Sequence, residues 1–152
     1  MRALLQRVDS ATVTVADETV GAISEGLLAF LGVARGDSAE ELEWLAGKIL
    51  GLRIFNDATG RMNRSVGDIG GSVLLVSQFT LQANVQKGRR PGFDRAAPPE
   101  AAESLYRLMA ERLSREIPTQ TGRFGADMRV HLCNHGPATF LVDTAERQQS
   151  SR

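Results

Sequence analysis

Gly70-Gly71-Ser72-Val73-Leu74-Leu75-Val76-Ser77-Gln78-Phe79-Thr80-Leu81 is the stretch that decides the fold. Its apolar, β-branched run predicts a buried strand. The run continues without a turn residue into three hydrogen-bonding side chains, Ser77, Gln78 and Thr80. A buried hydroxyl or amide without a partner costs about 1–3 kcal/mol. These side chains therefore either bond one another or line a ligand pocket.

Length and composition predict a small cytoplasmic protein. The chain of 152 residues is read as one domain over residues 1–145, followed by a polar, frayed tail over residues 146–152. Its 18 basic and 18 acidic side chains exclude a global basic field, so that any RNA contact is local. No apolar run reaches the roughly 20 residues of a membrane span, and charge interrupts the start too early for a signal peptide. The single Cys133 favours a reducing compartment.

Local patterns divide the chain into strands, helix, strands, helix and strands. A hairpin turn is expected at Ala16-Asp17-Glu18, and a helix over 39–50 begins at the capping box formed by Ser38 and Glu41. Pro98-Pro99 begins a second helix that runs to about residue 116. Strands are expected over 2–8, 11–15, 27–33, the central run, 128–133 and 138–142, with a long loop over 82–99 and a turn at Asn134-His135-Gly136-Pro137.

The two helices predict the layers. Each has one apolar face: Leu42, Leu45, Ala46 and Ile49 on the first, and Ala102, Leu105, Leu108, Met109 and Leu113 on the second. Two helices cannot cover both faces of about seven strands. We therefore expect an α+β fold of three layers, β-β-α, with a curled or double, barrel-like mixed sheet and both helices on one face. The uncovered sheet favours a homodimer.

Two common kinds of catalytic site receive little support. His131, Cys133 and His135 share one face of a strand, but three ligands within five residues and no second cluster make a poor zinc site, so no metal or cofactor is predicted. Ser77 could join a histidine and an aspartate in a triad, although no Gly-x-Ser-x-Gly elbow surrounds it. A serine esterase therefore stays an alternative.

Two further features allow more than one interpretation. Lys87, Arg89 and Arg90 lie in the long loop, where they form either an ordinary solvated surface or a contact with phosphates. Gly136-Pro137 is an ordinary turn unless its peptide bond is cis. A cis bond would aim the Gly136 carbonyl outward, where it could accept a hydrogen bond from an ammonium group.

Several motifs, taken together, resemble those of the D-aminoacyl-tRNA deacylases. They are Gln6-Arg7-Val8, Met62-Asn63, Ser77-Gln78-Phe79-Thr80-Leu81, Arg90-Pro91-x-Phe93, Thr121-Gly122-x-Phe124-Gly125-Ala126-x-Met128 and Asn134-x-Gly136-Pro137-x-Thr139. The resemblance covers about residues 1–142. One departure is His135, which occupies a position where the family commonly has an acidic residue.

The resemblance implies an enzyme that hydrolyses D-aminoacyl-tRNA and glycyl-tRNA, spares L-aminoacyl-tRNA, and so proofreads translation. It implies a homodimer in which a cis Gly136-Pro137 enters the pocket of the partner, with Arg7, Asn134 and Thr139 beside it. Ser77, Gln78, Phe79 and Thr80 become the catalytic segment, with Phe124 and Met128 at the terminal adenine. tRNA is the implied partner, without DNA or membrane. A non-catalytic RNA-binding module with the same pocket stays a second alternative.

Plain chemistry suggests how such a site would work. Backbone N–H groups of Phe79 and Thr80 are natural donors to an oxyanion, and removing one such donor typically costs 10²–10³ in rate. The Thr80 hydroxyl has no base among its sequence neighbours, so we expect direct attack by water. The Gly136 carbonyl would accept from the α-ammonium group, and an L side chain would collide with the Gly-Pro backbone.

Overall fold

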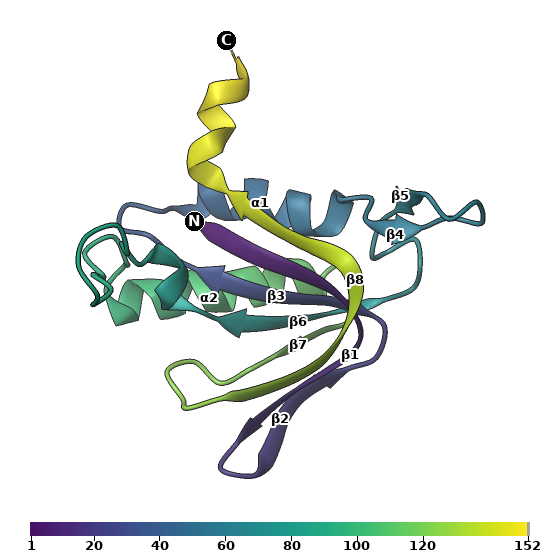
Figure 1. Cartoon of the computed structure of the whole chain (residues 1–152), viewed down its shortest axis with the longest axis horizontal. Coiled ribbons are helices and arrows are strands. Elements are labelled where there is room, and N and C mark those ends of the chain that lie inside the picture. The colour runs from purple at the N-terminus through teal and green to yellow at the C-terminus, as the bar shows by residue number, and fades with distance from the viewer. Residues whose placement is uncertain (152) are drawn as a thin grey trace.

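The computed structural model describes residues 1–151 of the chain, with helices on one side of a strongly curved sheet (Figure 1). Its elements are, in order, β1 (Arg2–Val15), β2 (Glu18–Ile23), β3 (Gly26–Gly32), α1 (Ala39–Gly51), β4 (Phe55–Asn56), β5 (Met62–Arg64), β6 (Ser72–Ser77), the 3₁₀ helix η1 (Phe79–Gln82), α2 (Pro99–Ser114), β7 (Thr119–Thr121), β8 (Arg129–Asp143) and the 3₁₀ helix η2 (Thr144–Ser151). None of the described helices is both long and apolar enough to cross a membrane.

The main sheet is mixed. Its strand order is β2-β1-β3-β6-β7, and β8 pairs with β1. β1 is antiparallel to β2, β3 and β8, whereas β6 is parallel to β3 and β7. The long strands β1 and β8 bend together and carry the sheet round on itself (Figure 1). β4 and β5 form a separate two-stranded sheet.

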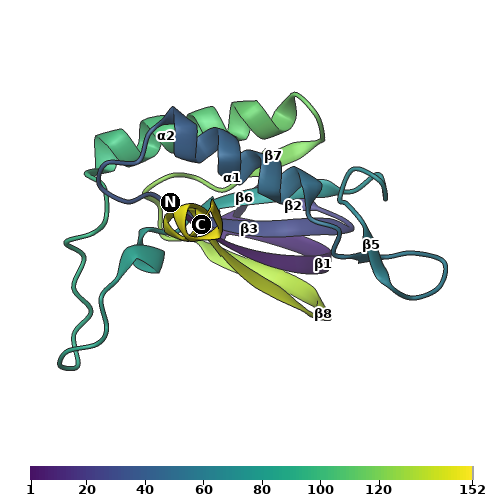
Figure 2. The same ribbon diagram turned by 90° about the horizontal axis from the view of Figure 1, so that it is seen from above.

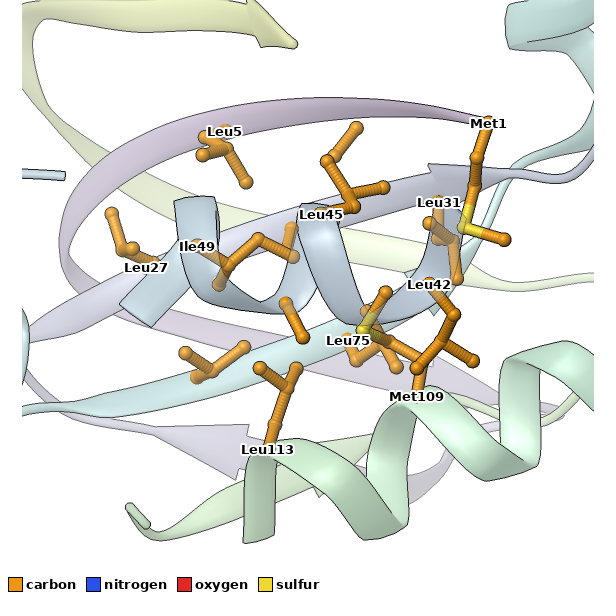
Figure 3. Packing of buried hydrophobic residues seen from close by; sticks show 14 of the residues in the cluster. Met1, Leu5, Leu27, Leu31, Leu42, Leu45, Ile49, Leu75, Met109 and Leu113 are labelled. Carbon is orange, nitrogen blue, oxygen red and sulfur yellow. The ribbon is translucent and has the colours of Figure 1, made fainter. Parts of the chain in front are cut away.

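Two apolar cores lie on opposite faces of this sheet. The larger core packs α1 and α2 onto the sheet, with Leu45, Ile49, Leu75, Met109 and Leu113 fully buried (Figure 3). The helices lie together on one face of the sheet (Figure 2). The smaller core fills the inside of the curl and comprises Val8, Ala11, Val13, Ile23, Leu28, Leu74 and Val76. The predicted α+β fold, with helices on one face of a curled, mixed sheet, is confirmed.

Turns and caps follow the sequence closely. Ala16 and Asp17 have φ of 46° and 66°, as the tight turn between β1 and β2 requires. At the start of α1, the Glu41 carboxylate accepts from the Ser38 amide at 2.8 Å, and the Ser38 hydroxyl accepts from the Glu40 amide at 3.2 Å. The predicted hairpin and capping box are confirmed.

Several predictions about elements need correction. Asn134 to Pro137 do not reverse the chain: they bulge within the single strand β8, because Gln6 and Val8 of β1 pair with Thr139 and Asn134. The two first strands likewise form the single strand β1. The central strand, β6, ends at Ser77, and η1 begins two residues later at Phe79. The short strand β7 was not predicted.

The second helix is rotated from the predicted face. Leu108 is 48% exposed, while Tyr106 is buried with Ala102, Met109 and Leu113. A frayed tail is predicted over residues 146–152. In the structure the backbone of residues 146–151 continues η2, and the Arg147 side chain forms an ion pair with Glu40. Residue 152 and the side chains of 148–151 lie outside the described residues, so fraying there stays a prediction.

Candidate active site

A pocket of about 620 Å³ opens at the carboxyl ends of the parallel strands β3 and β6. Ligands commonly bind at such ends, because the chain leaves the sheet there and its loops form a crevice. The walls come from the ends of β3 and β6, the start of η1, residues 93–99, the first turns of α2 and residues 124–130. Predicted site residues that line the pocket are Ser77, Gln78, Phe79, Phe124 and Met128.

The start of η1 is fixed against the end of β3. The Gln78 amide donates to the Leu31 carbonyl at 2.8 Å, and the buried Gln82 side chain donates to the Gly32 carbonyl at 2.8 Å. A Cβ on Gly32 would lie 2.9 Å from the Gln78 carbonyl oxygen, so only glycine permits this close approach. The segment that leaves β6 is therefore held on the floor of the pocket.

Two backbone amides are free where β6 ends. Within the described residues, neither the Phe79 nor the Thr80 amide has an intramolecular acceptor, and no side chain caps η1. Free amides at the first positions of a helix are donors available to a ligand. Gln78 donates to the Thr80 hydroxyl, while Ser77 and Gln78 line the pocket. The polar side chains were expected either to bond one another or to line a pocket. Gln78 does both, Ser77 lines the pocket, and Thr80 bonds Gln78 without lining the pocket.

Aromatic and apolar groups form the opposite wall. The rings of Tyr106 and Phe124 lie 5.7 Å apart at 46°. The Tyr106 hydroxyl donates to the Leu75 carbonyl at 2.9 Å, and burial raises the pKa of Tyr106 to about 12, so it stays protonated and holds its place. A Cβ on Gly122 would lie 2.7 Å from Met128 Sδ, so this glycine lets Met128 fold over the strand.

The lining also includes three charged or aromatic residues that the sequence reasoning missed, Arg35, Tyr106 and Asp127, together with Phe93, which it quoted only as part of a motif. Tyr106 lies four residues after Ala102 and three before Met109, so helical spacing could have placed it on the buried face. Phe93 contacts Phe79, with ring centroids 5.0 Å apart. Arg35 and Asp127 lie in loops, where the sequence carries no periodic signal.

The predicted residues of the selective motif form a second, separate group. Gly136-Pro137 is a cis peptide on the bulge of β8, and Gly136, Pro137, Asn134 and Thr139 are all exposed. None of them lines the pocket of their own chain. The structure therefore divides the predicted site residues into a concave group and an exposed group.

Arg7 anchors the bulge from inside. Its side chain is only 4% exposed; Nε donates to the His135 carbonyl at 2.8 Å, and an Nη donates to the Ile54 carbonyl at 2.8 Å. Asn56 accepts a weaker bond from the same nitrogen at 3.4 Å. The bond to His135 agrees with the expectation that Arg7 lies beside Gly136-Pro137.

Lys87, Arg89 and Arg90 are exposed on the loop after η1. Asn84 and Gly92 exchange backbone bonds of 2.8 and 2.9 Å, which close the base of the loop next to Phe93. Within the described part of the chain none of the three basic side chains forms an ion pair. Free positive charge therefore lies on a loop whose base, at Phe93, lines the pocket.

The residues considered for metal or triad chemistry lie apart from the pocket. His135 Nδ1 is 3.4 Å from an oxygen of Asp9, and Cys133 Sγ is 3.6 Å from the other. Among the described residues, no group of three or more such side chains is arranged to hold a metal ion. Neither histidine bonds to Ser77 or lines the pocket. The arrangement therefore favours backbone donors over a triad.

Comparisons with known proteins agree with the motifs. The family model described as "D-Tyr-tRNA(Tyr) deacylase" matches residues 4–143. A D-aminoacyl-tRNA deacylase of Geobacter sulfurreducens is 54% identical over 99% of this chain and 100% of its own length. A solved structure of a protein named "c-Myc DNA Unwinding Element Binding Protein" is 42% identical with a TM-score of 0.90, and covers 94% of this chain and 98% of that one.

A solved structure of a probable eukaryotic D-amino acid tRNA deacylase shares the fold, with a TM-score of 0.77 at 20% identity over 93% of this chain and 98% of that one. The family predicted from the motifs is therefore confirmed: the chain belongs to the D-Tyr-tRNA(Tyr) deacylase family.

Proposed function

We propose that this protein hydrolyses the ester bond of D-aminoacyl-tRNA, and of glycyl-tRNA, and thereby removes mischarged tRNA in the cytoplasm. The observation that carries the proposal is the pair of free amides, of Phe79 and Thr80, beside an aromatic pocket. The pocket volume of about 620 Å³ is in the range of small-ligand sites. Membership of a deacylase family supports the same substrate.

The ester carbonyl would receive hydrogen bonds from the two amides as a water molecule attacks its carbon. The tetrahedral intermediate then collapses, the ribose hydroxyl leaves with a proton, and free D-amino acid and tRNA are released. An aminoacyl ester is already labile, so stabilisation of the oxyanion supplies the help that is needed. The Thr80 hydroxyl, held by Gln78 outside the pocket, is not the attacking group.

Selection against L substrates would come from Gly136-Pro137 of a second copy of the chain. This segment is exposed and lies outside its own pocket, which supports insertion into another subunit. The Gly136 carbonyl would accept from the α-ammonium group, and an L side chain would meet the backbone. Glycine has no side chain to collide and would be hydrolysed. A backbone wall of this kind accepts many D side chains while it rejects every L one.

The terminal adenosine would lie between Phe124 and Met128, by stacking and apolar contact. Lys87, Arg89 and Arg90 would contact phosphates of the acceptor end, since they are exposed on a loop whose base lines the pocket and form no ion pair within the described residues. These contacts are local, which agrees with the balanced overall charge.

The test is a comparison of matched D- and L-aminoacyl-tRNA, with and without a chelator. We expect rapid loss of the D ester, loss of glycyl-tRNA and survival of the L ester, with no effect of the chelator. Absence of D-selective hydrolysis would refute the proposal, and inhibition by the chelator would indicate a metal. Labelling of Ser77 by a fluorophosphonate would instead support a serine esterase.

A second candidate function is nucleic-acid binding without catalysis. It is favoured by the name of the 42% identical relative of known structure, which describes that protein as binding a DNA element. The same assay separates the two functions, because a binding module would retain tRNA without hydrolysing either ester.

A further inference from the structure

Arg35 is the one cation among the described residues that line the pocket, and Asp127 is the one carboxylate. The two form no ion pair with each other. The rest of the lining is neutral and mainly apolar or aromatic. A single arginine in such a lining has no role in the ester chemistry or in base stacking described above.

The backbone and side chain of Arg35 are both held in place. Its amide donates to the Arg95 carbonyl at 2.9 Å, and its Nε donates to the Asp94 carbonyl at 2.9 Å. Ala34 and Ala96 form a bridge beside these bonds. The guanidinium is therefore oriented through Nε, while its terminal N–H groups have no acceptor within the described part of the chain. Such a fixed fork of free donors suits an oxyanion of planar or tetrahedral geometry.

The proposed function limits what that anion can be, and the inference rests on it. The base of the terminal nucleotide is neutral, the amino acid carries an ammonium group, and the ester is uncharged. The 5′-phosphate of the terminal adenosine is the anion nearest to the ester in every such substrate, because the other phosphates belong to nucleotides further along the tRNA. The carboxylate of Asp127 would repel it, which leaves Arg35 as the complementary side of the pocket.

We propose that Arg35 binds the 5′-phosphate of the 3′-terminal nucleotide and thereby positions the ester over the Phe79 and Thr80 amides. Its contribution is to binding, so the variant Arg35→Ala should raise KM for D-aminoacyl-tRNA about tenfold while kcat is retained. Arg35→Lys keeps the positive charge but loses the forked arrangement of donors. Its KM should therefore lie between that of the wild type and that of Arg35→Ala.

The direct test uses adenosine and 5′-AMP, which differ only in the phosphate, with binding measured by calorimetry at fixed salt. Wild-type protein should bind 5′-AMP about tenfold more tightly than adenosine, and Arg35→Ala should bind both alike. Arg115→Ala is the charge-matched control, because Arg115 follows the far end of α2 from the pocket-lining Pro99 and Ala102. It should retain the preference.

The proposal is overturned if wild type binds 5′-AMP no more tightly than adenosine, or if Arg35→Ala keeps the preference. Kinetics with D-aminoacyl-adenosine, which lacks the phosphate, provide a second readout: Arg35→Ala should hydrolyse it as wild type does. Failure of wild type to hydrolyse any D ester would refute the proposed function, whereas the nucleotide binding would still decide the role of Arg35.

Discussion

The two groups of site residues differ in shape and in what surrounds them. The segment from Ser77 to Phe79 lies on the floor of a pocket built entirely by its own chain. Gly136-Pro137 lies on an exposed bulge, beside which the buried Arg7 side chain donates to the His135 carbonyl. One chain therefore has a pocket that contains Ser77, Gln78 and Phe79 and, apart from it, an exposed bulge that carries Gly136-Pro137. The comparison teaches that catalysis and selectivity, which we propose for these two groups, would be separable within one chain.

For the group of residues in the pocket, the largest effect is expected from the removal of one backbone N–H donor. Phe79→Pro should lower kcat by about 10²–10³ relative to Phe79→Ala, because both lose the ring and only proline loses the N–H. Phe79 is the first residue of η1, where a helix tolerates proline, and Gln78 before it has φ −147° and ψ 78°, outside the α region that a following proline disfavours. Single-turnover hydrolysis measures the rate. Equal rates for the two variants would show that this amide does not act.

For the exposed bulge that carries Gly136-Pro137, the largest effect is expected from Arg7→Ala. The buried carbonyl of Ile54 and the partly buried carbonyl of His135 would lose their donor, so the free energy of unfolding should fall by about 3 kcal/mol. Urea unfolding measures it. Arg107→Ala is the control: its pair with Glu103 on α2 is exposed, so the change should cost about 1 kcal/mol or less. Equal losses would mean that Arg7 does not anchor the bulge.

Within the pocket, Phe124→Ala should raise KM about tenfold, since stacking of a base on an aromatic side chain contributes about 1–3 kcal/mol. The change in kcat should be small, because Phe124 lies on the wall opposite the free amides. Leu108→Ala, on the exposed face of α2, is the matched control and should leave both constants unchanged. Steady-state kinetics on D-aminoacyl-tRNA distinguish the two. A fall in kcat with constant KM would contradict the binding role.

The smallest effect is expected for Thr80→Ala. The variant keeps the Thr80 amide and loses only a hydroxyl that accepts from Gln78 outside the pocket. Deacylation should stay within about threefold of wild type, in contrast to the loss of an oxyanion donor. Quenched-flow analysis, with mass spectrometry of the protein, checks it. A trapped acyl-threonine in wild type, or loss as large as that of Phe79→Pro, would make Thr80 the nucleophile.

Local chemistry in the sequence predicted most of the fold. The capping box at Ser38, the turn at Ala16-Asp17 and the apolar spacing of the first helix are short-range patterns that each favour one local structure. The prediction of a turn at Asn134 to Pro137 was wrong, because a Gly-Pro pair can occur in a bulge of a strand as well as in a turn. Only the pairing of β8 with β1 across the whole chain determines which of the two forms.

The site was predictable where residues follow one another and less so where the fold brings them together. Ser77, Gln78 and Phe79 leave a buried strand, and the polarity of Ser77 and Gln78 indicated a pocket there. Arg35 and Asp127 join that pocket from distant loops, without any periodic pattern. The separation of Gly136-Pro137 from its own pocket depends on the curl of the sheet, which follows from packing rather than from local sequence.

The proposed division of the site between two subunits is tested most directly by mixed dimers. Chains that carry Phe79→Pro and chains that carry Pro137→Ala would be co-expressed with different tags, and the doubly tagged species isolated. In that species, one site combines an intact pocket with an intact wall from the other chain. We predict that it hydrolyses D-aminoacyl-tRNA and again spares the L ester, as neither parent does. Hydrolysis as unselective as that of Pro137→Ala alone would place pocket and wall in the same subunit and contradict the account.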